Sequence, residues 1–161
     1  MNISSKAYIS KLADIEESTK GSIISIADGV NIDSFVKIKA AGGIGDIFID
    51  SNTYINSGTV MYIGNGIKIG KNVLIAANCT LAPVNHEYRL ANKTIIEQRF
   101  MPSRGGITIG NDVWIGANTV ILDGTNIPDG VVIGASSLVK GNLQSYSIYS
   151  GNPLQLRGKR T

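Results

Sequence analysis

The sequence predicts an all-β fold, a parallel β-helix built from repeats of six residues. First, an aliphatic residue recurs at every sixth position from Ile109 to Val139. Second, the 161 residues include 25 isoleucines and 19 glycines but only 6% aromatic residues. Third, Gly, Asn and Asp gather between the aliphatic positions, where a short side chain or none allows a tight turn. A period of six fits neither a helix nor an isolated strand, whereas three such steps close one triangular coil of about 18 residues.

The β-helix is predicted over approximately residues 23–140, with the recurring aliphatic side chains pointing inward and stacking from coil to coil. These positions are, in order, Ile26, Ile32, Ile38, Ile44, Ile49, Ile55, Met61, Ile63, Ile69, Ile75, Leu81, Ile109, Ile115, Ile121, Ile127, Ile133 and Val139. The spacing slips from Ile44 to Ile49 and from Met61 to Ile63, where we expect local bulges. Residues 1–20 lack the repeat, and we expect LADIEEST to form a short helix or turn that caps the first coil.

The six-residue spacing has one long interruption, the step of 28 residues from Leu81 to Ile109. Segment 82–106 is polar, contains two prolines and holds the only histidine, so it predicts a loop ejected from one corner of the coil. Loops of this length in a compact domain are usually functional. The tail, 141–161, is expected to leave the β-helix and to end irregularly or in a short strand. The whole chain, 1–161, is predicted to be a single domain.

The composition excludes several functional classes. One Cys and one His rule out an intrachain disulfide framework, a Cys-cluster metal site and a multi-histidine zinc centre, so no metal is expected. A metal-dependent hydratase of the carbonic anhydrase type, which needs three histidine ligands, is set aside for the same reason. No apolar run approaches the roughly 18 residues that span a membrane.

The charge pattern favours a phosphate-bearing ligand. The net charge is +3, and much of the excess lies in the C-terminal residues Arg157, Lys159 and Arg160. No basic stripe interleaved with aromatic residues is present, so nucleic-acid binding is not expected. The N-terminal residues lack a charged segment followed by an apolar stretch, which predicts no signal peptide and a cytoplasmic location.

The hexapeptide pattern, the stretch IGNDVWIGANTVIL, the histidine in VNHEYR and the SGNP of the tail together resemble the hexapeptide-repeat acyltransferases. The similarity covers roughly residues 26–157. It is greatest to the galactoside and maltose O-acetyltransferases and to the shorter sugar O-acetyltransferases of polysaccharide synthesis. This resemblance implies a left-handed parallel β-helix that forms a homotrimer. It also implies that acetyl-CoA binds in the cleft between subunits and donates its acetyl group to a sugar or glycan.

His86 occupies the position of the catalytic histidine in that family. A sugar hydroxyl is a poor nucleophile while it is protonated, and imidazole is the side chain best suited to accept its proton near neutral pH. The sequence therefore predicts His86 as the general base. Glu87 and Glu97 lie in the same loop and are candidates for orienting the imidazole.

Three residues are expected to contact the acceptor. Asn56 matches the active-site asparagine of the family, and Tyr54, two residues earlier, faces the same corner. Trp114 matches a tryptophan beside the cleft. A structural turn residue is the alternative for Asn56, and packing between subunits is the alternative for Trp114.

The resemblance also places the donor. Ala117 lies where the family offers a backbone N–H to the thioester, and Ala135 where the backbone contacts the pantetheine arm. Lys140 takes a position that is threonine in the galactoside enzyme. Two arginines that hold the nucleotide end there are replaced by Gln155 and Gly158. Basic residues close by that supply charge instead are Arg157, Lys159 and Arg160.

Two other functions remain open on the sequence alone. An N-acetyltransferase that acts on an amino sugar or a nucleotide-linked amino sugar would use the same fold and donor. A non-catalytic β-helix scaffold would bind no acetyl-CoA.

Overall fold

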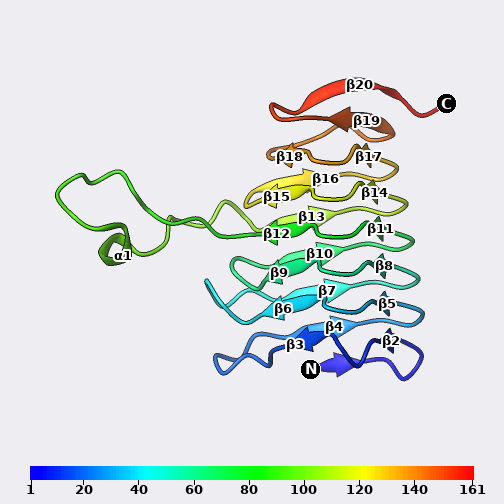
Figure 1. Cartoon of the computed structure of the whole chain (residues 1–161), viewed down its shortest axis with the longest axis horizontal. Helices are drawn as coiled ribbons and strands as arrows, with labels where there is room; N and C mark the ends of the chain where they lie inside the picture. The colour runs from blue at the N-terminus through cyan, green and yellow to red at the C-terminus, as the bar shows by residue number, and fades with distance from the viewer.

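The computed structural model describes all 161 residues, and it shows a stack of triangular coils made of short strands (Figure 1). Each coil contributes one strand to each of three parallel sheets. Sheet A contains β1 (Asn2–Ile3), β4 (Ile24–Ile26), β7 (Ile47–Ile49), β10 (Ile67–Ile69), β13 (Ile107–Ile109) and β16 (Thr125–Ile127). Sheet B contains β2 (Tyr8–Ile9), β5 (Asn31–Ile32), β8 (Tyr54–Ile55), β11 (Leu74–Ile75), β14 (Trp114–Ile115), β17 (Val132–Ile133), β19 (Ser147–Ser150) and β20 (Gln155–Lys159). Sheet C contains β3 (Asp14–Ile15), β6 (Lys37–Lys39), β9 (Val60–Tyr62), β12 (Thr80–Ala82), β15 (Val120–Leu122) and β18 (Leu138–Val139). The predicted parallel β-helix is therefore confirmed.

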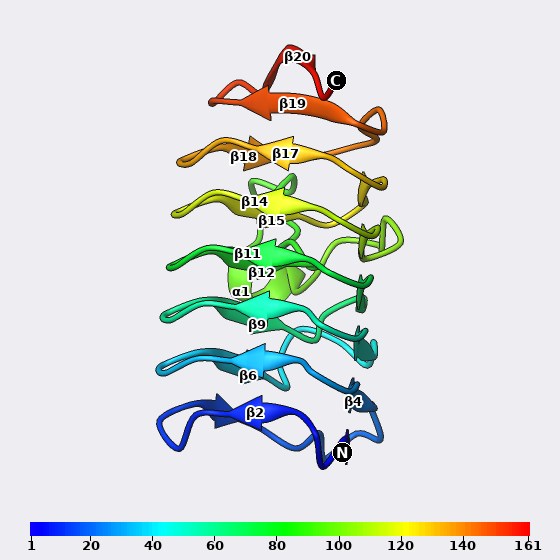
Figure 2. The ribbon, with the colours of Figure 1, turned by 90° about the vertical axis from the view of Figure 1, so that its right-hand side faces the viewer.

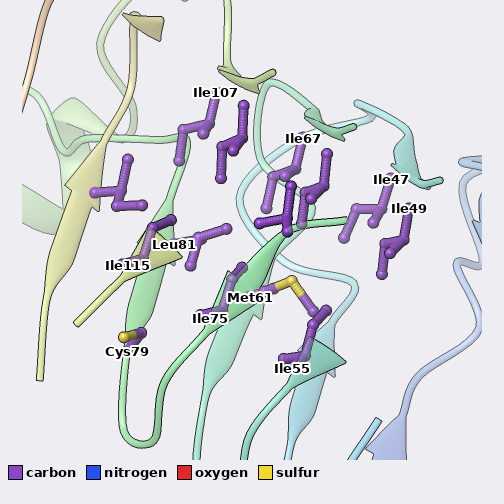
Figure 3. Close-up of a cluster of buried hydrophobic side chains, with 14 of the residues drawn as sticks. Ile47, Ile49, Ile55, Met61, Ile67, Ile75, Cys79, Leu81, Ile107 and Ile115 are labelled. Carbon is purple, nitrogen blue, oxygen red and sulfur yellow. The ribbon is translucent and has the colours of Figure 1, made fainter. Parts of the chain in front are cut away.

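The core is a column of aliphatic side chains inside the triangle (Figure 3). Side chains in a strand alternate between the two faces, so residues such as Ile67 and Ile69 point inward while Lys68 between them faces out. Parallel pairing keeps equivalent residues in register, and Ile55, Ile75 and Ile115 stack directly on one another. The predicted inward isoleucines of the C-terminal coils are all at most 2% exposed: Ile109, Ile115, Ile121, Ile127 and Ile133.

One predicted core residue is wrong. Ile44 is 73% exposed, and the inward positions of its coil are filled by Ile47 and Ile49. The reason is that residues 40–46 make an excursion between β6 and β7 and carry Ile44 away from the axis. This excursion, and not a bulge in a strand, accounts for the first slip in the spacing.

The β-helix begins earlier than the predicted residue 23. Residues 2–15 form β1, β2 and β3, a complete first coil, and contain no helix. Ile3, Ile9 and Ile15 hold the six-residue spacing, but they remain partly exposed because no coil stacks beneath them. Lys39 ties the first coil to the second through its ammonium, which lies 2.6 Å from Asp14 and 2.7 Å from Glu16.

Connections between the sheets differ sharply in length. The links from sheet A to sheet B (the A–B corner) and from sheet B to sheet C (the B–C corner) have four residues in every coil, for example 70–73 and 76–79. The link from sheet C back to sheet A (the C–A corner) varies, and it includes residues 16–23, 40–46, 63–66 and 83–106. Residues 83–106, here called the loop, project from this corner as predicted (Figure 1) and carry the only helix, α1 (Ile95–Gln98). This four-residue helix is far too short to cross a membrane.

The C-terminal tail is more regular than predicted. β19 continues sheet B in parallel with β17, and β20 then turns back to pair antiparallel with β19. Leu143 and Leu154 pack against the last core residues. The tail therefore closes the C-terminal end of the stack, whereas the first coil has no such cover.

Candidate functional site

His86 lies where the two stems of the loop come together. It forms an isolated antiparallel bridge with Phe100. On either side, the Glu87 N–H donates to the Arg99 carbonyl at 2.9 Å, and the Met101 N–H donates to the Asn85 carbonyl at 2.8 Å. The loop is therefore closed at its base by backbone hydrogen bonds that fix the position of His86.

The imidazole of His86 has a defined hydrogen-bonding role. Its Nδ1 atom lies 3.2 Å from the backbone oxygen of Arg99. A carbonyl oxygen only accepts, so Nδ1 carries the proton and Nε2 keeps its lone pair in the neutral ring. The ring also packs on Phe100, with 4.8 Å between the ring centroids. The side chain is exposed, and its Nε2 atom has no hydrogen-bond partner in the chain.

Neither carboxylate expected to orient His86 contacts it. Hydrogen bonds from the Arg89 guanidinium, and then from the backbone N–H groups of Arg89 and Tyr88, lower the pKa of the Glu87 carboxyl to about 2. Glu97 instead caps α1, where it accepts hydrogen bonds from the hydroxyl and the N–H of Thr94. The orienting group is a backbone carbonyl, which no side-chain pattern in the sequence could show.

A pocket of about 320 Å³ opens beside His86 at the C–A corner. Seven residues line it: Ala41, Gly42, Tyr62, Ala82, Val84, His86 and Phe100. Sequence reasoning singled out only His86 among them. The others come from the excursion 40–46, from outward positions of sheet C and from the loop, which only the fold brings together.

The B–C corner presents a column of backbone N–H groups that have no acceptor. The N–H groups of the first and third residues of this corner are used; for example, Gly116 donates to Ile133 and Asn118 donates to Ala77. The N–H groups between them donate to nothing, and they belong to Ser57, Ala77, Ala117 and Ala135. All four side chains are small, so the column is not covered by its own residues.

At the A–B corner, N–H groups at the same position of the corner have side-chain acceptors. There the equivalent N–H of Lys71 donates to the Asn111 side chain at 2.9 Å, and that of Asn111 donates to the Asp129 carboxylate at 2.6 Å. Side chains thus satisfy the donors of Lys71 and Asn111 at the A–B corner. At the B–C corner the Ser34 N–H has such a partner, the Asp33 carboxylate, but the N–H groups of the four later coils do not. A chain of amide carbonyls running along the B–C corner would find a matching row of donors.

Tyr54 and Trp114 lie on the outer face of sheet B, in register with Leu74 between them. Both aromatic side chains are about half exposed, and Trp114 borders a groove of about 250 Å³. Figure 1 shows sheet B on the side of the stack opposite to the loop, and Figure 2 faces that sheet directly. One chain therefore does not bring Tyr54 or Trp114 to His86.

Asn56 follows β8 at the start of the B–C corner. Its side-chain amide donates to the Ile75 carbonyl of the next coil at 2.7 Å. This contact is the structural role that the sequence left as an alternative. The amide oxygen has no partner and faces the same corner as the free N–H groups.

Lys140 and the three basic residues of the tail lie in four different environments. Lys140 lines a C-terminal pocket of about 280 Å³, together with Tyr149 and Pro153. The Arg157 Nε donates to Ser150 Oγ at 2.8 Å, and Lys159 is exposed without an ion-pair partner. Arg160 is held at the A–B corner, where its guanidinium lies 2.9 Å from the carboxylate of Asp112. Arg160 is therefore held in a structural contact at the A–B corner, away from the other basic residues.

Two family profiles match the coils. Residues 106–141 match the bacterial transferase hexapeptide profile (six repeats), and residues 49–83 match the hexapeptide repeat of succinyl-transferase. A probable macrolide acetyltransferase from Lysinibacillus sphaericus is 51% identical over 65 residues, which is 40% of this chain and 35% of that protein. The galactoside O-acetyltransferase of Escherichia coli K12 is 39% identical over 85 residues, which is 50% of this chain and 38% of that protein. The chain thus matches little more than a third of the length of these relatives.

Among the experimental structures that are similar over almost the full chain is one of an N-acyltransferase. It is a variant of AntD, an N-acyltransferase from Bacillus cereus, in complex with dTDP-4-amino-4,6-dideoxyglucose and coenzyme A. The sequence identity is 30%, the TM-score is 0.82, and the match covers 99% of this chain and 84% of AntD.

The tautomer of His86 gives a direct test of the site geometry. The chain has one histidine, so imidazole ¹⁵N resonances of labelled protein belong to His86 without further assignment. In the neutral ring we expect the Nδ1–H form to dominate, because Arg99 offers only an acceptor. Unfolding in urea serves as the control and should restore the distribution of free imidazole. Dominance of the Nε2–H form in the folded protein would show that this hydrogen bond is absent.

Proposed function

The chain belongs to the hexapeptide-repeat acyltransferase family, and we propose that it is an acetyl-CoA-dependent acetyltransferase whose acceptor is a sugar hydroxyl. Its fold is the left-handed parallel β-helix of that family. The observation that carries the proposal is His86, an exposed imidazole with its Nδ1–H bound to a fixed carbonyl and its Nε2 free, at the edge of a pocket. Imidazole in this state is suited to general-base catalysis near neutral pH.

The B–C corner suits the donor. The pantetheine arm of acetyl-CoA carries two amide groups, whose carbonyls need donors, and the open N–H group of Ala135 is such a donor, while that of Ala117 is left for the thioester. Their small side chains leave room for an extended ligand. We assign Lys140, Arg157 and Lys159 to the phosphates at the C-terminal end, since their cationic groups are exposed there.

The proposed reaction follows from these placements. Acetyl-CoA supplies an activated acetyl thioester. His86 Nε2 takes the proton of the acceptor hydroxyl as the hydroxyl oxygen bonds to the thioester carbon, and the Ala117 N–H stabilises the negative charge that develops on the carbonyl oxygen. The C–S bond then breaks, and His86 returns its proton to the departing sulfur. The net products are an acetyl ester and free coenzyme A.

A homotrimer completes the proposed site. The outer face of sheet A is mainly polar, with Lys68, Thr108 and Asn126, although Phe48 beside Lys68 is 40% exposed. That of sheet B carries Tyr54, Leu74, Trp114 and Val132. That of sheet C carries Lys37 and Lys39 in β6 and then Val60, Tyr62, Val120, Leu122 and Leu138. The apolar stretches of sheets B and C suit a ring in which sheet B of one subunit packs on sheet C of the next. Such packing would bring Tyr54 and Trp114 of one subunit towards His86 of its neighbour.

Transfer to an amino sugar is the second candidate function. The full-length similarity to an N-acyltransferase that binds a dTDP-linked amino sugar favours it. An amine that is neutral attacks a thioester with less help from a base than a hydroxyl does. The loss of kcat on replacing His86 therefore distinguishes a hydroxyl acceptor from an amine acceptor.

Replacing His86 tests the chemistry. For a hydroxyl acceptor, His86→Ala should lower kcat by roughly 10² to 10⁴ with little change in acetyl-CoA affinity. The measurement is thiol release from acetyl-CoA over sugars, amino sugars and their nucleotide-linked forms. Glu87→Gln is the matched control in the same loop and should keep the wild-type rate. Near-normal turnover of His86→Ala on the true acceptor would contradict general-base catalysis and favour the amine.

A bulky side chain at Ala135 tests the donor path. Ala135→Trp should weaken acetyl-CoA binding at least tenfold, or by about 1.4 kcal/mol, because the indole would cover the free N–H column. The control is Lys71→Trp, which places the same side chain on an exposed turn at the opposite corner. Isothermal titration of both variants gives the comparison. Equal affinities would exclude the B–C corner as the pantetheine path, and no binding by the wild type would favour a non-catalytic scaffold.

The trimer is tested by placing a charge on sheet B. Wild-type protein should sediment at three times the 17.0 kDa chain mass. Leu74→Glu should sediment as a monomer, because a carboxylate would be buried between subunits without a partner. Lys68→Glu, on the polar face of sheet A in the same coil, should remain trimeric. A wild-type monomer at micromolar concentration would exclude this assembly.

A further inference from the structure

At the C–A corner, the excursion 40–46 packs against the start of the loop beside His86. A Cβ atom added at Gly42 would lie 2.8 Å from Val84 Cγ1, and one at Gly43 would lie 2.1 Å from the Gly64 carbonyl oxygen. The run of small residues from Ala40 to Gly43 therefore lets residues 40–46 lie close to the start of the loop. The excursion that displaces Ile44 from the core thus forms a wall of the His86 pocket.

This pocket is almost entirely apolar. Among its seven residues, Tyr62 and His86 are the only two whose side chains carry polar atoms. Ala41 and Ala82 add little volume, which leaves the cavity open, and Val84 and Phe100 supply hydrocarbon surface. An acceptor group that enters here meets mainly carbon next to the proposed base.

The hydroxyl of Tyr62 has no hydrogen-bond partner in the structure, although the residue is only partly exposed. Tyr62 is the outward residue at the end of β9, and the pairing of sheet C fixes its backbone. Tyr62 and His86 are therefore the two residues that can offer a side-chain donor or acceptor in an otherwise apolar wall. A hydroxyl on the acceptor next to the reacting group would satisfy the Tyr62 hydroxyl.

From this arrangement we infer that the acceptor is a 6-deoxy sugar, whose methyl group packs against Ala41, Ala82 and Val84 while a neighbouring hydroxyl bonds to Tyr62. A hydroxymethyl group in the same place would lose its hydrogen bonds to water and gain none, which disfavours the ordinary hexose. The inference rests on the proposed function, because it takes the pocket beside His86 as the acceptor site.

The test compares acceptors that differ only at C6. The probes are methyl β-D-fucoside against methyl β-D-galactoside, and dTDP-6-deoxyglucose against dTDP-glucose, each with acetyl-CoA. In the pair that the enzyme accepts, kcat/KM for the 6-deoxy sugar should exceed that of its partner by about 10- to 100-fold, as expected when one hydroxyl enters an apolar pocket.

Two variants separate the parts of the pocket. Ala41→Leu fills the space for the methyl group, and it should lower kcat/KM for the 6-deoxy probe by about tenfold and abolish the preference between the pair. Ile44→Leu lies in the same excursion but does not line the pocket, and it should match the wild type. Tyr62→Phe should lower kcat/KM for both sugars by roughly three- to tenfold and preserve the preference, since it removes only a hydrogen bond. Tyr8→Phe, in the first coil, is its control.

The outcomes distinguish this inference from the proposed function. If sugars are acetylated but both members of a pair react equally, or if Ala41→Leu leaves the preference intact, the 6-deoxy assignment is wrong and the sugar acetyltransferase stands. If no sugar in either series is acetylated by protein that binds acetyl-CoA, the hydroxyl acceptor and the 6-deoxy assignment that rests on it are both overturned, and the amino sugar is favoured.

Discussion

The register of the inward aliphatic side chains is the constraint on which the rest of the structure depends. Each coil must place its isoleucines directly over those of the coil before, as Ile55, Ile75 and Ile115 do. An added residue at any strand or fixed corner would turn the following side chains to the wrong face. The A–B and B–C corners accordingly keep four residues throughout, and all variation in length is confined to the C–A corner.

This confinement separates two kinds of chemistry. The constant B–C corner repeats one backbone geometry from coil to coil, so it can offer evenly spaced N–H groups such as those of Ala117 and Ala135. The variable C–A corner can hold a loop and an excursion of unrelated sequence, and it carries His86 next to Tyr62 of sheet C. A regular surface suits a donor that is the same for a whole family, whereas a variable one suits an acceptor that differs between its members.

Most of the fold could be predicted from the six-residue spacing because that spacing is itself the packing rule. The errors arose where aliphatic residues kept or lost the spacing by coincidence. Ile44 stands six residues after Ile38 yet lies outside the core, and Ile3, Ile9 and Ile15 share the spacing within residues 1–20, which were expected to lack the repeat. For the site, an alignment motif is enough to select His86. The carbonyl of Arg99 reaches His86 through the closure of the loop, and the pairing of sheet C brings Tyr62 to the same pocket. Neither arrangement leaves a trace in the local sequence.

The two ends of the stack differ in how they are covered. At the C-terminal end, β20 runs against β19 and closes sheet B with an antiparallel strand. At the other end, the first coil is anchored from one side only and leaves Ile3 partly in water. In a linear array each unit is stabilised by its neighbours, so local opening begins at the unit with a single neighbour. The chain should therefore fray from its N-terminal coil inward, and the coils that carry His86 and the free N–H column lie deep enough in the array to stay ordered while it does.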